Sequence, residues 1–318
     1  MAPDVLLALD YGGTKLSAAI VERGAHEWRA LERVASPPRH DARYEQTTMC
    51  ALARKLLGDA TPAAMGISFG GPVDAARGRV ILSHHIPGWE DTPLRDQWHA
   101  AFGAPVSVDN DANVAALGEY TFGAGHGCAS LLYVTISTGV GGGFVIGGKI
   151  YNGADAMAGE IGHTICDPRG PVCICGRRGC VEAMACGPAI VRDAGERLAT
   201  NANAVTQLRE LGGTRGNLTA ADVARAANDG DELARAVMED AARALGFGIG
   251  TAITLMNPVR VVIGGGVSKS GERWWQVVRA SARSNTLPQM RVEIVPAALG
   301  DDAPLWGAVA LAEGSIRE

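Results

Sequence analysis

The stretch Val5-Leu-Leu-Ala-Leu-Asp-Tyr-Gly-Gly-Thr-Lys15 is a short apolar run followed by a turn rich in glycine. The run is typical of a buried strand, and residues 16–21 have the composition of a partner strand, which predicts a hairpin. Residues 131–146 repeat this order, because the apolar run Leu131–Ile136 precedes Ser137-Thr-Gly-Val-Gly-Gly-Gly143 and the short run Phe144–Ile146. We interpret the two segments as a diverged internal duplication, with one half in each of two domains.

Outside the two hairpins, strands alternate with helices, which predicts an α/β fold. The expected strands are residues 63–69, 105–108, 260–263 and 292–295, and the expected helices are residues 43–57, 112–120, 232–256, 272–281 and 304–313. Thr219-Ala-Ala-Asp222 resembles a capping box that opens one more helix. Three glycines of the helix at 232–256 are expected to let it approach a sheet closely. A chain of 318 residues exceeds what one core usually supports, so two domains are predicted.

Charge, hydropathy and cysteine content exclude several classes of protein. The net charge is −5, and no basic patch is long enough to follow a phosphate backbone, so nucleic acid is not an expected partner. No apolar run reaches the roughly 18 residues that predict a membrane span. A strand that begins at Val5 leaves no room for a signal peptide. We therefore expect a cytoplasmic protein whose cysteines stay reduced.

Three of the seven cysteines cluster within eight residues, and a histidine precedes them. Cys173, Cys175 and Cys180 follow His163, and one imidazole with three thiols is a ligand set for tetrahedral zinc. Cys166 is an alternative to His163 as the fourth ligand. Because four protein ligands close the coordination sphere, the sequence predicts a structural zinc ion that does not polarise a substrate.

Two glutamates flank the cysteine cluster, and two further carboxylates follow a strand. Glu160 and Glu182 are either surface carboxylates or, if zinc fixes the loop, partners for the vicinal hydroxyls of a sugar. Asp109-Asn110-Asp111 stands between a strand and a helix. Asp111 either caps that helix or acts as a general base toward a sugar hydroxyl that attacks phosphorus.

Three Gly-rich turns directly follow strands. In Asp10-Tyr-Gly-Gly-Thr-Lys15, glycine amides and Thr14 can donate to phosphate oxygens, and Asp10 can hold Mg²⁺ through water; a plain hairpin turn is the alternative. Ser137-Thr138-Gly139 and Gly264-Gly265-Gly266 are the other two. Three such turns fit a nucleotide between two α/β domains.

Taken together, four segments resemble the ROK family of sugar kinases and sugar-responsive repressors. They are Asp10–Lys15, Val108–Asp111, Gly159–His163 and Cys173–Glu182, which occur in this order. The resemblance implies a two-lobed actin-like ATPase fold of the hexokinase, RNase H-like type, with a mixed sheet flanked by helices in each lobe. The smaller N-terminal lobe would comprise residues 1–118 and 303–318, and the larger lobe residues 119–302.

The resemblance also assigns roles to individual residues. Asp111 would be the catalytic base, and the sugar would contact Gly71, Asn110, Asp111, Glu160, His163 and Glu182. ATP would contact Asp10, Gly12, Gly13, Thr14, Lys15, Thr138, Gly139 and Gly265. Zinc would be held by His163, Cys173, Cys175 and Cys180, so that His163 binds metal with one ring nitrogen and sugar with the other.

The expected reaction is transfer of the ATP γ-phosphoryl group to a hexose hydroxyl, O6 of glucose in the first place, with Mg²⁺ bridging the phosphates. Mannose, fructose, N-acetylmannosamine, N-acetylglucosamine or a cyclitol are alternative substrates, and polyphosphate is an alternative donor. A non-catalytic sugar sensor is the less favoured reading, since the repressors carry an added N-terminal DNA-binding segment. The resemblance further implies a homodimer or a homotetramer.

Overall fold

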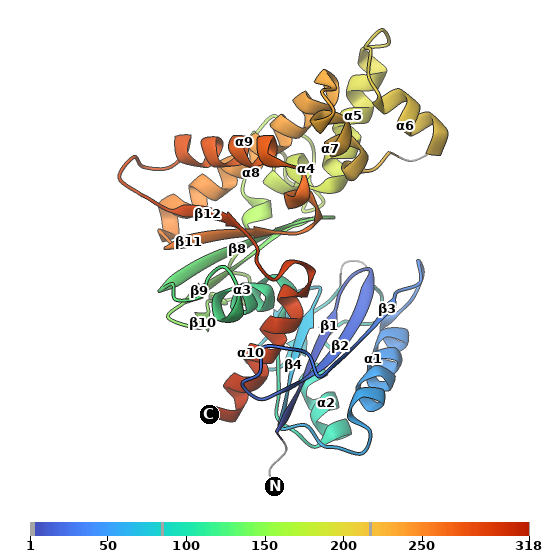
Figure 1. Ribbon diagram of the computed structural model, residues 1–318, viewed down its shortest axis with the longest axis vertical. Helices are drawn as coiled ribbons and strands as arrows, with labels where there is room; N and C mark the ends of the chain where they lie inside the picture. Colours follow the sequence, from blue (N-terminus) through green and yellow to red (C-terminus); the bar gives the residue numbers. More distant parts are fainter. Residues whose placement is uncertain (1–3, 84–85, 216–217, 318) are drawn as a thin grey trace. The chain divides into compact units, whose positions relative to one another are not determined.

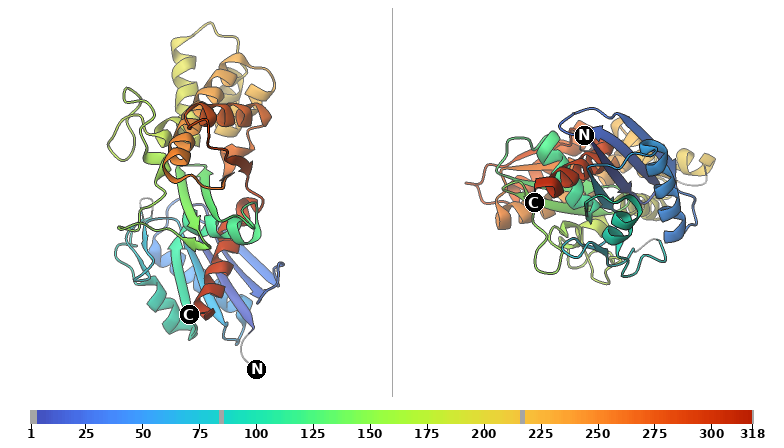
Figure 2. Two further views of the ribbon diagram at one scale, coloured as in Figure 1. Left: turned by 90° about the vertical axis from the view of Figure 1, so that its left-hand side faces the viewer. Right: turned by 90° about the horizontal axis from the view of Figure 1, so that it is seen from below.

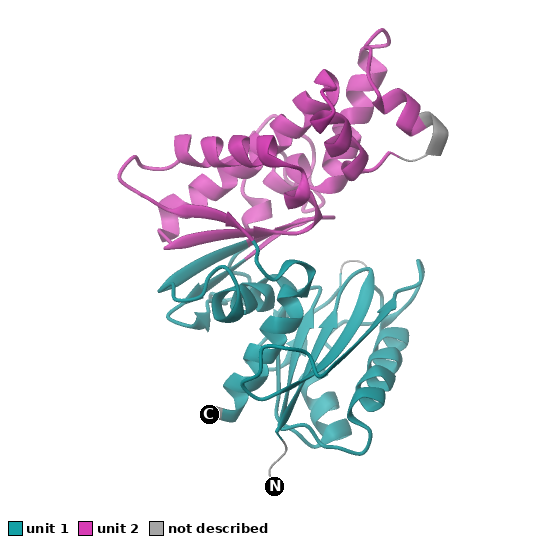
Figure 3. Cartoon of the chain, viewed as in Figure 1, with its two compact units in different colours: residues 1–133, 143–159, 297–318 teal, residues 134–142, 160–296 magenta. Residues whose placement is uncertain are grey.

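The computed structural model describes residues 4–83, 86–215 and 218–317, which form two compact units (Figures 1 and 3). Unit 1 comprises residues 1–133, 143–159 and 297–318, and unit 2 comprises residues 134–142 and 160–296. The lobe limits expected from the sequence stay a prediction; these units differ from them chiefly in residues 119–133 and 143–159. Among the described residues, no helix combines the length and the apolar character needed to cross a bilayer.

Five strands form the first sheet, in the order β3-β2-β1-β4-β7 (Figure 1). β1, β2 and β3 pair antiparallel, whereas β4 is parallel to β1 and β7 is parallel to β4. A tight turn is enough to join antiparallel neighbours, while each parallel strand needs a crossover. The bounds are β1 Val5–Tyr11, β2 Lys15–Glu22, β3 Ala30–Ala35, β4 Ala64–Phe69 and β7 Val106–Asn110.

Helices cover both faces of this sheet (Figures 1 and 2). Because side chains alternate along a strand, Leu7 and Leu9 pack with α1 and α2, while Leu6 and Ala8 pack with α3 and α10. Gly66 lets α10 approach β4, since an added Cβ would lie 1.8 Å from Ala308 O. The bounds are α1 Ala42–Leu57, α2 Leu94–Phe102, α3 Asp111–Phe122 and α10 Ala303–Arg317.

The second sheet has the order β10-β9-β8-β11-β12. Three consecutive strands again lie on one side and two later strands on the other, which agrees with the predicted internal duplication. A short two-stranded pair, β5 with β6, forms a third sheet. The bounds are β5 Val73–Asp74, β6 Arg79–Val80, β8 Ser130–Ile136, β9 Val140–Ile146, β10 Lys149–Ile150, β11 Arg260–Gly264 and β12 Glu293–Pro296.

The long helix α8 is the centre of the helical part of unit 2 and packs against α4, α5, α7 and α9. The prediction that its glycines let it approach a sheet is wrong. An added Cβ would lie 2.6 Å from Val278 O of α9 at Gly246 and 2.8 Å from Val181 Cγ2 of α4 at Gly248. The glycines therefore admit neighbouring helices. The bounds are α4 Val181–Ala185, α5 Gly187–Thr200, α6 Leu208–Arg215, α7 Ala220–Asn228, α8 Glu232–Met256 and α9 Glu272–Ser284.

The elements predicted from apolar periodicity are confirmed, and Thr219 with Asp222 forms the expected capping box. Two turns are shorter than predicted. Asp10 and Tyr11 continue β1, because they pair with β2 and β4. The glycines at 141–143 belong to β9, where an added Cβ at Gly143 would lie 2.8 Å from Ala112 O. β3, β5, β6, β10, α2, α4, α5 and α6 were not predicted.

Candidate active site

The sheet register of unit 1 places two buried carboxylates in one row. Asp10 of β1 pairs with Ser68 of β4, and Ser68 pairs with Asp109 of β7. Asp10 is 5 % exposed and accepts a hydrogen bond of 2.8 Å from Ser68 Oγ. Burial raises the pKa of Asp10 to about 7, although the hydrogen bond from Ser68 lowers it. The nearby charge of Asp111 also raises this pKa. A divalent cation beside Asp10 would offset this accumulation of negative charge.

The turn after β1 consists of residues 12–14. At Gly13, an added Cβ would meet nothing within 4 Å, so the backbone of this turn is open to close approach by an anion. Thr14 is exposed, and its carbonyl accepts a hydrogen bond of 3.0 Å from Ser36 N. Lys15 begins β2, and its charge lowers the pKa of Asp10, although burial outweighs it. The geometry therefore fits the predicted phosphate contact.

Asp111 is the first residue of α3, and Asn110 provides the cap of this helix. Asn110 Oδ1 accepts hydrogen bonds from Ala112 N and Asn113 N, while its Nδ2 donates to Gly71 O at 3.0 Å. The alternative in which Asp111 caps α3 is thereby wrong. Asp111 Oδ1 accepts from Ala112 N at 2.7 Å.

Gly70 lies between the catalytic candidate and the first Gly-rich turn. A Cβ added to Gly70 would lie 3.8 Å from Asp111 Oδ2 and 3.9 Å from Gly13 N. Gly71 is equally confined, because its added Cβ would lie 2.8 Å from Leu82 O and 3.0 Å from Phe69 Cε1. Unit 1 thus brings together Gly71, Asn110, Asp111, Asp10 and the turn, as the sequence predicted.

A hydrogen-bond network behind this corner was not predicted. Asp109 is 4 % exposed and accepts from Asn113 Nδ2 at 3.0 Å, Asn152 Nδ2 at 3.1 Å and Asn110 N at 2.7 Å. Asn113 Nδ2 also donates to Asn152 Oδ1 at 3.3 Å. Asn152 stands 43 residues from Asp109, so only the fold reveals the pairing. The network holds the end of β7 and the loop after β10 in one position.

In unit 2, Glu182 contacts the Gly-rich turn after β8. Glu182 Oε2 accepts a hydrogen bond of 3.0 Å from Val140 N, and a Cβ added to Gly139 would lie 2.7 Å from the same oxygen. Gly265 has a φ of +87°, and its added Cβ would lie 2.3 Å from Ile136 O, so glycine is required there on both counts. Thr138, Gly139 and Gly265 accordingly belong to one region of unit 2.

A pocket of about 910 Å³ opens beside these turns. Its walls come from Ser137, Thr138, the first residues of α5, helix α7 and residues 266–270. Most of these residues were not predicted, because the small side chains that line the pocket from α5 and α7 form no motif. They are Gly187, Pro188, Val191, Ala220, Ala221 and Ala224. Arg192, Arg225 and Lys269 add positive charge to a largely aliphatic wall.

The predicted metal ligands converge within unit 2. The ligand atoms of His163, Cys173, Cys175 and Cys180 all lie within 4.8 Å of one another. Cys173 Sγ is 3.6 Å from His163 Nδ1, and Cys175 Sγ is 3.6 Å from Cys180 Sγ. Sulfurs that share a tetrahedral zinc ion stand about 3.8 Å apart, given Zn–S bonds of about 2.3 Å. The donor set therefore fits zinc.

Cys166 is not part of this cluster. Its thiol contacts Gly179 O at 3.4 Å and Met184 Sδ at 3.5 Å, and burial raises its pKa to about 11. Within the cluster, hydrogen bonds from Arg177 lower the pKa of Cys175 to about 6, whereas burial and the neighbouring thiols raise the pKa of Cys180 to about 12. All three groups could be thiolates together only beside a cation that offsets their charge.

His163 connects the cluster to Glu160. Its Nδ1 faces Cys173, while its Nε2 lies 3.9 Å from Glu160 Oε2. The two ring nitrogens thus face different partners, the cysteines and a carboxylate. The resemblance implied metal on one nitrogen and a sugar hydroxyl on the other, which stays a prediction. Glu160 precedes the 3₁₀ turn Ile161–His163, and its side chain is half exposed, at 49 %. The carboxylate is accessible to a polar ligand.

Known proteins resemble this chain over most of its length. It is 40 % identical to a glucokinase of Halalkalibacterium halodurans, over 76 % of this chain and 74 % of that protein. It is 33 % identical to an N-acetylmannosamine kinase of Escherichia coli O6:H1, over 98 % of this chain and 99 % of that protein. A solved ROK family glucokinase of Streptomyces griseus, in complex with glucose and AMPPNP, matches with a TM-score of 0.83 and 34 % identity, over 98 % and 99 % of the two chains.

Fold and site together define an α/β hexose phosphotransferase of the actin-like ATPase, hexokinase type. The sequence pattern of the ROK family matches residues 6–315. The chain belongs to the ROK family.

Proposed function

We propose that this protein transfers the γ-phosphoryl group of ATP to O6 of glucose, with Asp111 as the general base. The observation that carries the proposal is the position of Asp111 at the first turn of α3, where Asn110 provides the helix cap. A carboxylate there can accept the hydroxyl proton as the sugar oxygen attacks phosphorus in line. The glucose complex of the Streptomyces griseus relative supports the choice of sugar.

ATP would bind along the Gly-rich turns. Amides of residues 12–14 and 138–139 would donate to phosphate oxygens. The adenine base of ATP would enter the 910 Å³ pocket beside α5 and α7. Asp10 would hold Mg²⁺ through water, and the ion would offset the charge of the phosphates.

The sugar would be held by residues of two kinds. Asn110 uses one Nδ2 hydrogen for Gly71 O and its Oδ1 for the cap, so its second Nδ2 hydrogen would donate to a hydroxyl. Glu160, His163 Nε2 and Glu182 would accept or share hydroxyl hydrogens. Zinc held by Cys173, Cys175, Cys180 and His163 Nδ1 would fix the loop and the histidine tautomer.

Asp111→Asn tests the general base. The amide cannot accept the hydroxyl proton, so kcat should fall by about a thousandfold, while the glucose dissociation constant should change by less than about threefold. A coupled assay measures the first quantity, and isothermal titration calorimetry the second. Substantial turnover by this variant would contradict the assignment.

A panel assay tests the substrate. Glucose, mannose, fructose, N-acetylmannosamine, N-acetylglucosamine and a cyclitol are compared with ATP and with polyphosphate as donors. We expect the highest kcat/KM for glucose with ATP. The 33 % identity to an N-acetylmannosamine kinase makes that sugar the second candidate.

Light scattering tests the proposed homodimer, with the tetramer as alternative.

A further inference from the structure

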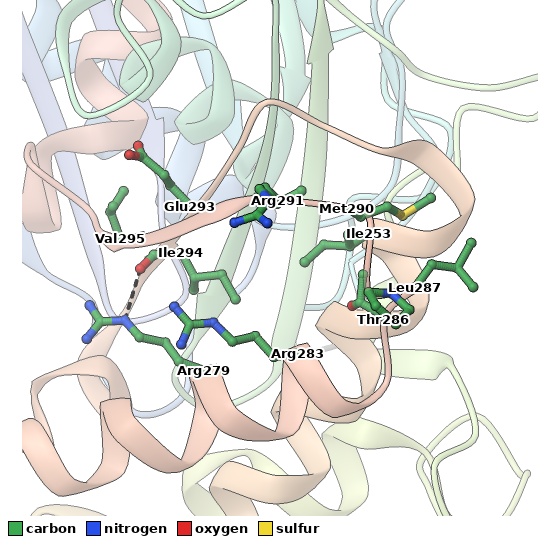
Figure 4. A pocket seen from close by; sticks show the side chains of 12 residues that line it. Ile253, Arg279, Arg283, Thr286, Leu287, Met290, Arg291, Glu293, Ile294 and Val295 are labelled. Carbon is green, nitrogen blue, oxygen red and sulfur yellow. Dashed lines mark hydrogen bonds between the residues drawn. The ribbon is translucent and has the colours of Figure 1, made fainter.

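A separate pocket of about 640 Å³ lies in unit 2, between α9, the end of α8 and the segment that leads into β12 (Figure 4). Buried Ile253 of α8 and buried Ile294 of β12 contribute apolar surface, and Leu287 and Met290 add more. None of the residues proposed above for sugar, ATP or zinc lines this pocket. Its volume falls within the range of small-molecule sites.

Three arginines line the pocket, and one of them is held in place. Arg279 Nε donates to Ile294 O at 3.1 Å, and the guanidinium carbon of Arg279 lies 5.0 Å from the ring centroid of Trp275. Figure 4 shows the guanidinium groups of Arg279 and Arg283 turned from α9 toward the segment that carries Arg291. Within the part of the chain that the structure describes, neither Arg283 nor Arg291 has a carboxylate oxygen within 4 Å.

The lining carries more positive than negative charge. Arg279 lies 3.7 Å from Glu272 Oε1 of α9, a residue outside the lining. Glu293 is the one carboxylate among the lining residues, and it pairs with Arg260 of β11 at 2.6 Å. Arg279 and Arg283 stand four residues apart on α9, a spacing at which like charges destabilise a helix. An anion placed between the guanidinium groups would reverse this repulsion.

We propose that this pocket binds a small organic phosphomonoester. The phosphoryl dianion would accept paired hydrogen bonds from the planar guanidinium groups of Arg283 and Arg291. The organic part would lie against Ile253, Leu287 and Met290. Two guanidinium groups beside an apolar wall fit a phosphoryl dianion joined to an apolar group better than they fit inorganic phosphate or an apolar molecule alone.

Phenyl phosphate is a suitable probe, because it joins a phosphoryl dianion to an apolar ring. Its binding is measured by isothermal titration calorimetry on the full chain with saturating AMPPNP and glucose, so that the proposed catalytic site is filled. We expect one binding site that weakens with ionic strength. Inorganic phosphate and phenol, the two halves of the probe, should each bind at least tenfold more weakly.

Variants locate the binding site. The double variant Arg283→Ala/Arg291→Ala should raise the Kd of phenyl phosphate at least tenfold, and both positions are exposed, so folding should be retained. Arg54→Ala, which removes an exposed arginine from α1, is the matched control and should bind as the wild type does. Leu287→Asn should weaken phenyl phosphate but not inorganic phosphate. Equal binding by the wild type and the double variant, or phenol binding as tight as phenyl phosphate, would overturn the proposal.

Discussion

The two units hold their site residues by different means. In unit 1, Asp10, Asn110 and Asp111 lie at strand ends and at the first turn of a helix, where sheet register and the buried network around Asp109 fix them. In unit 2, Glu160 and His163 lie at a short 3₁₀ turn in a loop, and the cysteine cluster would cross-link this loop if it holds the proposed zinc ion. Unit 1 should therefore be sensitive to charge and volume, and unit 2 to loss of metal.

The largest effect is expected from the charge of Asp10. Its folded-state pKa of about 7 lies above the ordinary value of 3.8, so the folded protein binds this proton more tightly than the unfolded chain. The resulting stabilisation is complete below about pH 4, is lost as pH rises through 7, and amounts to about 4 kcal/mol. Urea denaturation without Mg²⁺ or nucleotide, at pH 4 to 8, measures it.

Asp10→Asn isolates this contribution, because the amide stays neutral at every pH. The difference in unfolding free energy between wild type and variant should follow the titration just described. Asp59→Asn, at an exposed position, should keep the pH dependence of the wild type. Parallel curves for wild type and Asp10→Asn would refute a buried, proton-binding Asp10.

Volume at the same corner should matter next. Gly143→Ala places a Cβ 2.8 Å from Ala112 O, at the start of the helix that carries Asp111. Overpacking of this kind should lower the free energy of unfolding by about 3 kcal/mol. Gly13→Ala is the control, because its Cβ meets nothing within 4 Å and should change stability by less than about 0.5 kcal/mol. Equal losses in the two variants would refute the steric argument for Gly143.

Loss of metal should act on unit 2 and spare the chemistry of unit 1. Cys175→Ser removes one proposed zinc ligand, so the loop with Glu160 and His163 should loosen. The glucose KM should rise about tenfold, equivalent to about 1.4 kcal/mol, while kcat should change by less than about threefold. Metal analysis and steady-state kinetics check both points, with Cys50→Ser of α1 as control. Zinc-free protein with full sugar affinity would refute the role of zinc and leave that of Asp111 intact.

Features formed by residues that are close together in the chain could be predicted from the sequence. The spacing of Cys173, Cys175 and Cys180 is visible directly in the sequence, and the long Ala-rich stretch 232–256 predicts both ends of α8. Contacts between residues that are far apart in the chain, and surfaces made of small side chains without a motif, could not be predicted. Asn152 meets Asp109 only because the fold brings the loop after β10 to the end of β7. The small side chains of α5 and α7 become a pocket wall only once the helices pack.

The smallest effect is expected from Asn152→Ala. This variant also separates positioning of the catalytic carboxylate from stabilisation of the fold. Asp109 would lose one of its three hydrogen-bond donors, which should cost about 1 kcal/mol of unfolding free energy. Asn285→Ala is the matched control, because Asn285 Nδ2 donates to Ser281 O at the end of α9 and lies in unit 2. Both variants should lose similar stability in urea denaturation. Only Asn152→Ala should also lower kcat, by about fivefold, because the end of β7 that precedes Asp111 would be less firmly held. If the two variants had equal kcat, the network would stabilise the fold without positioning the catalytic carboxylate.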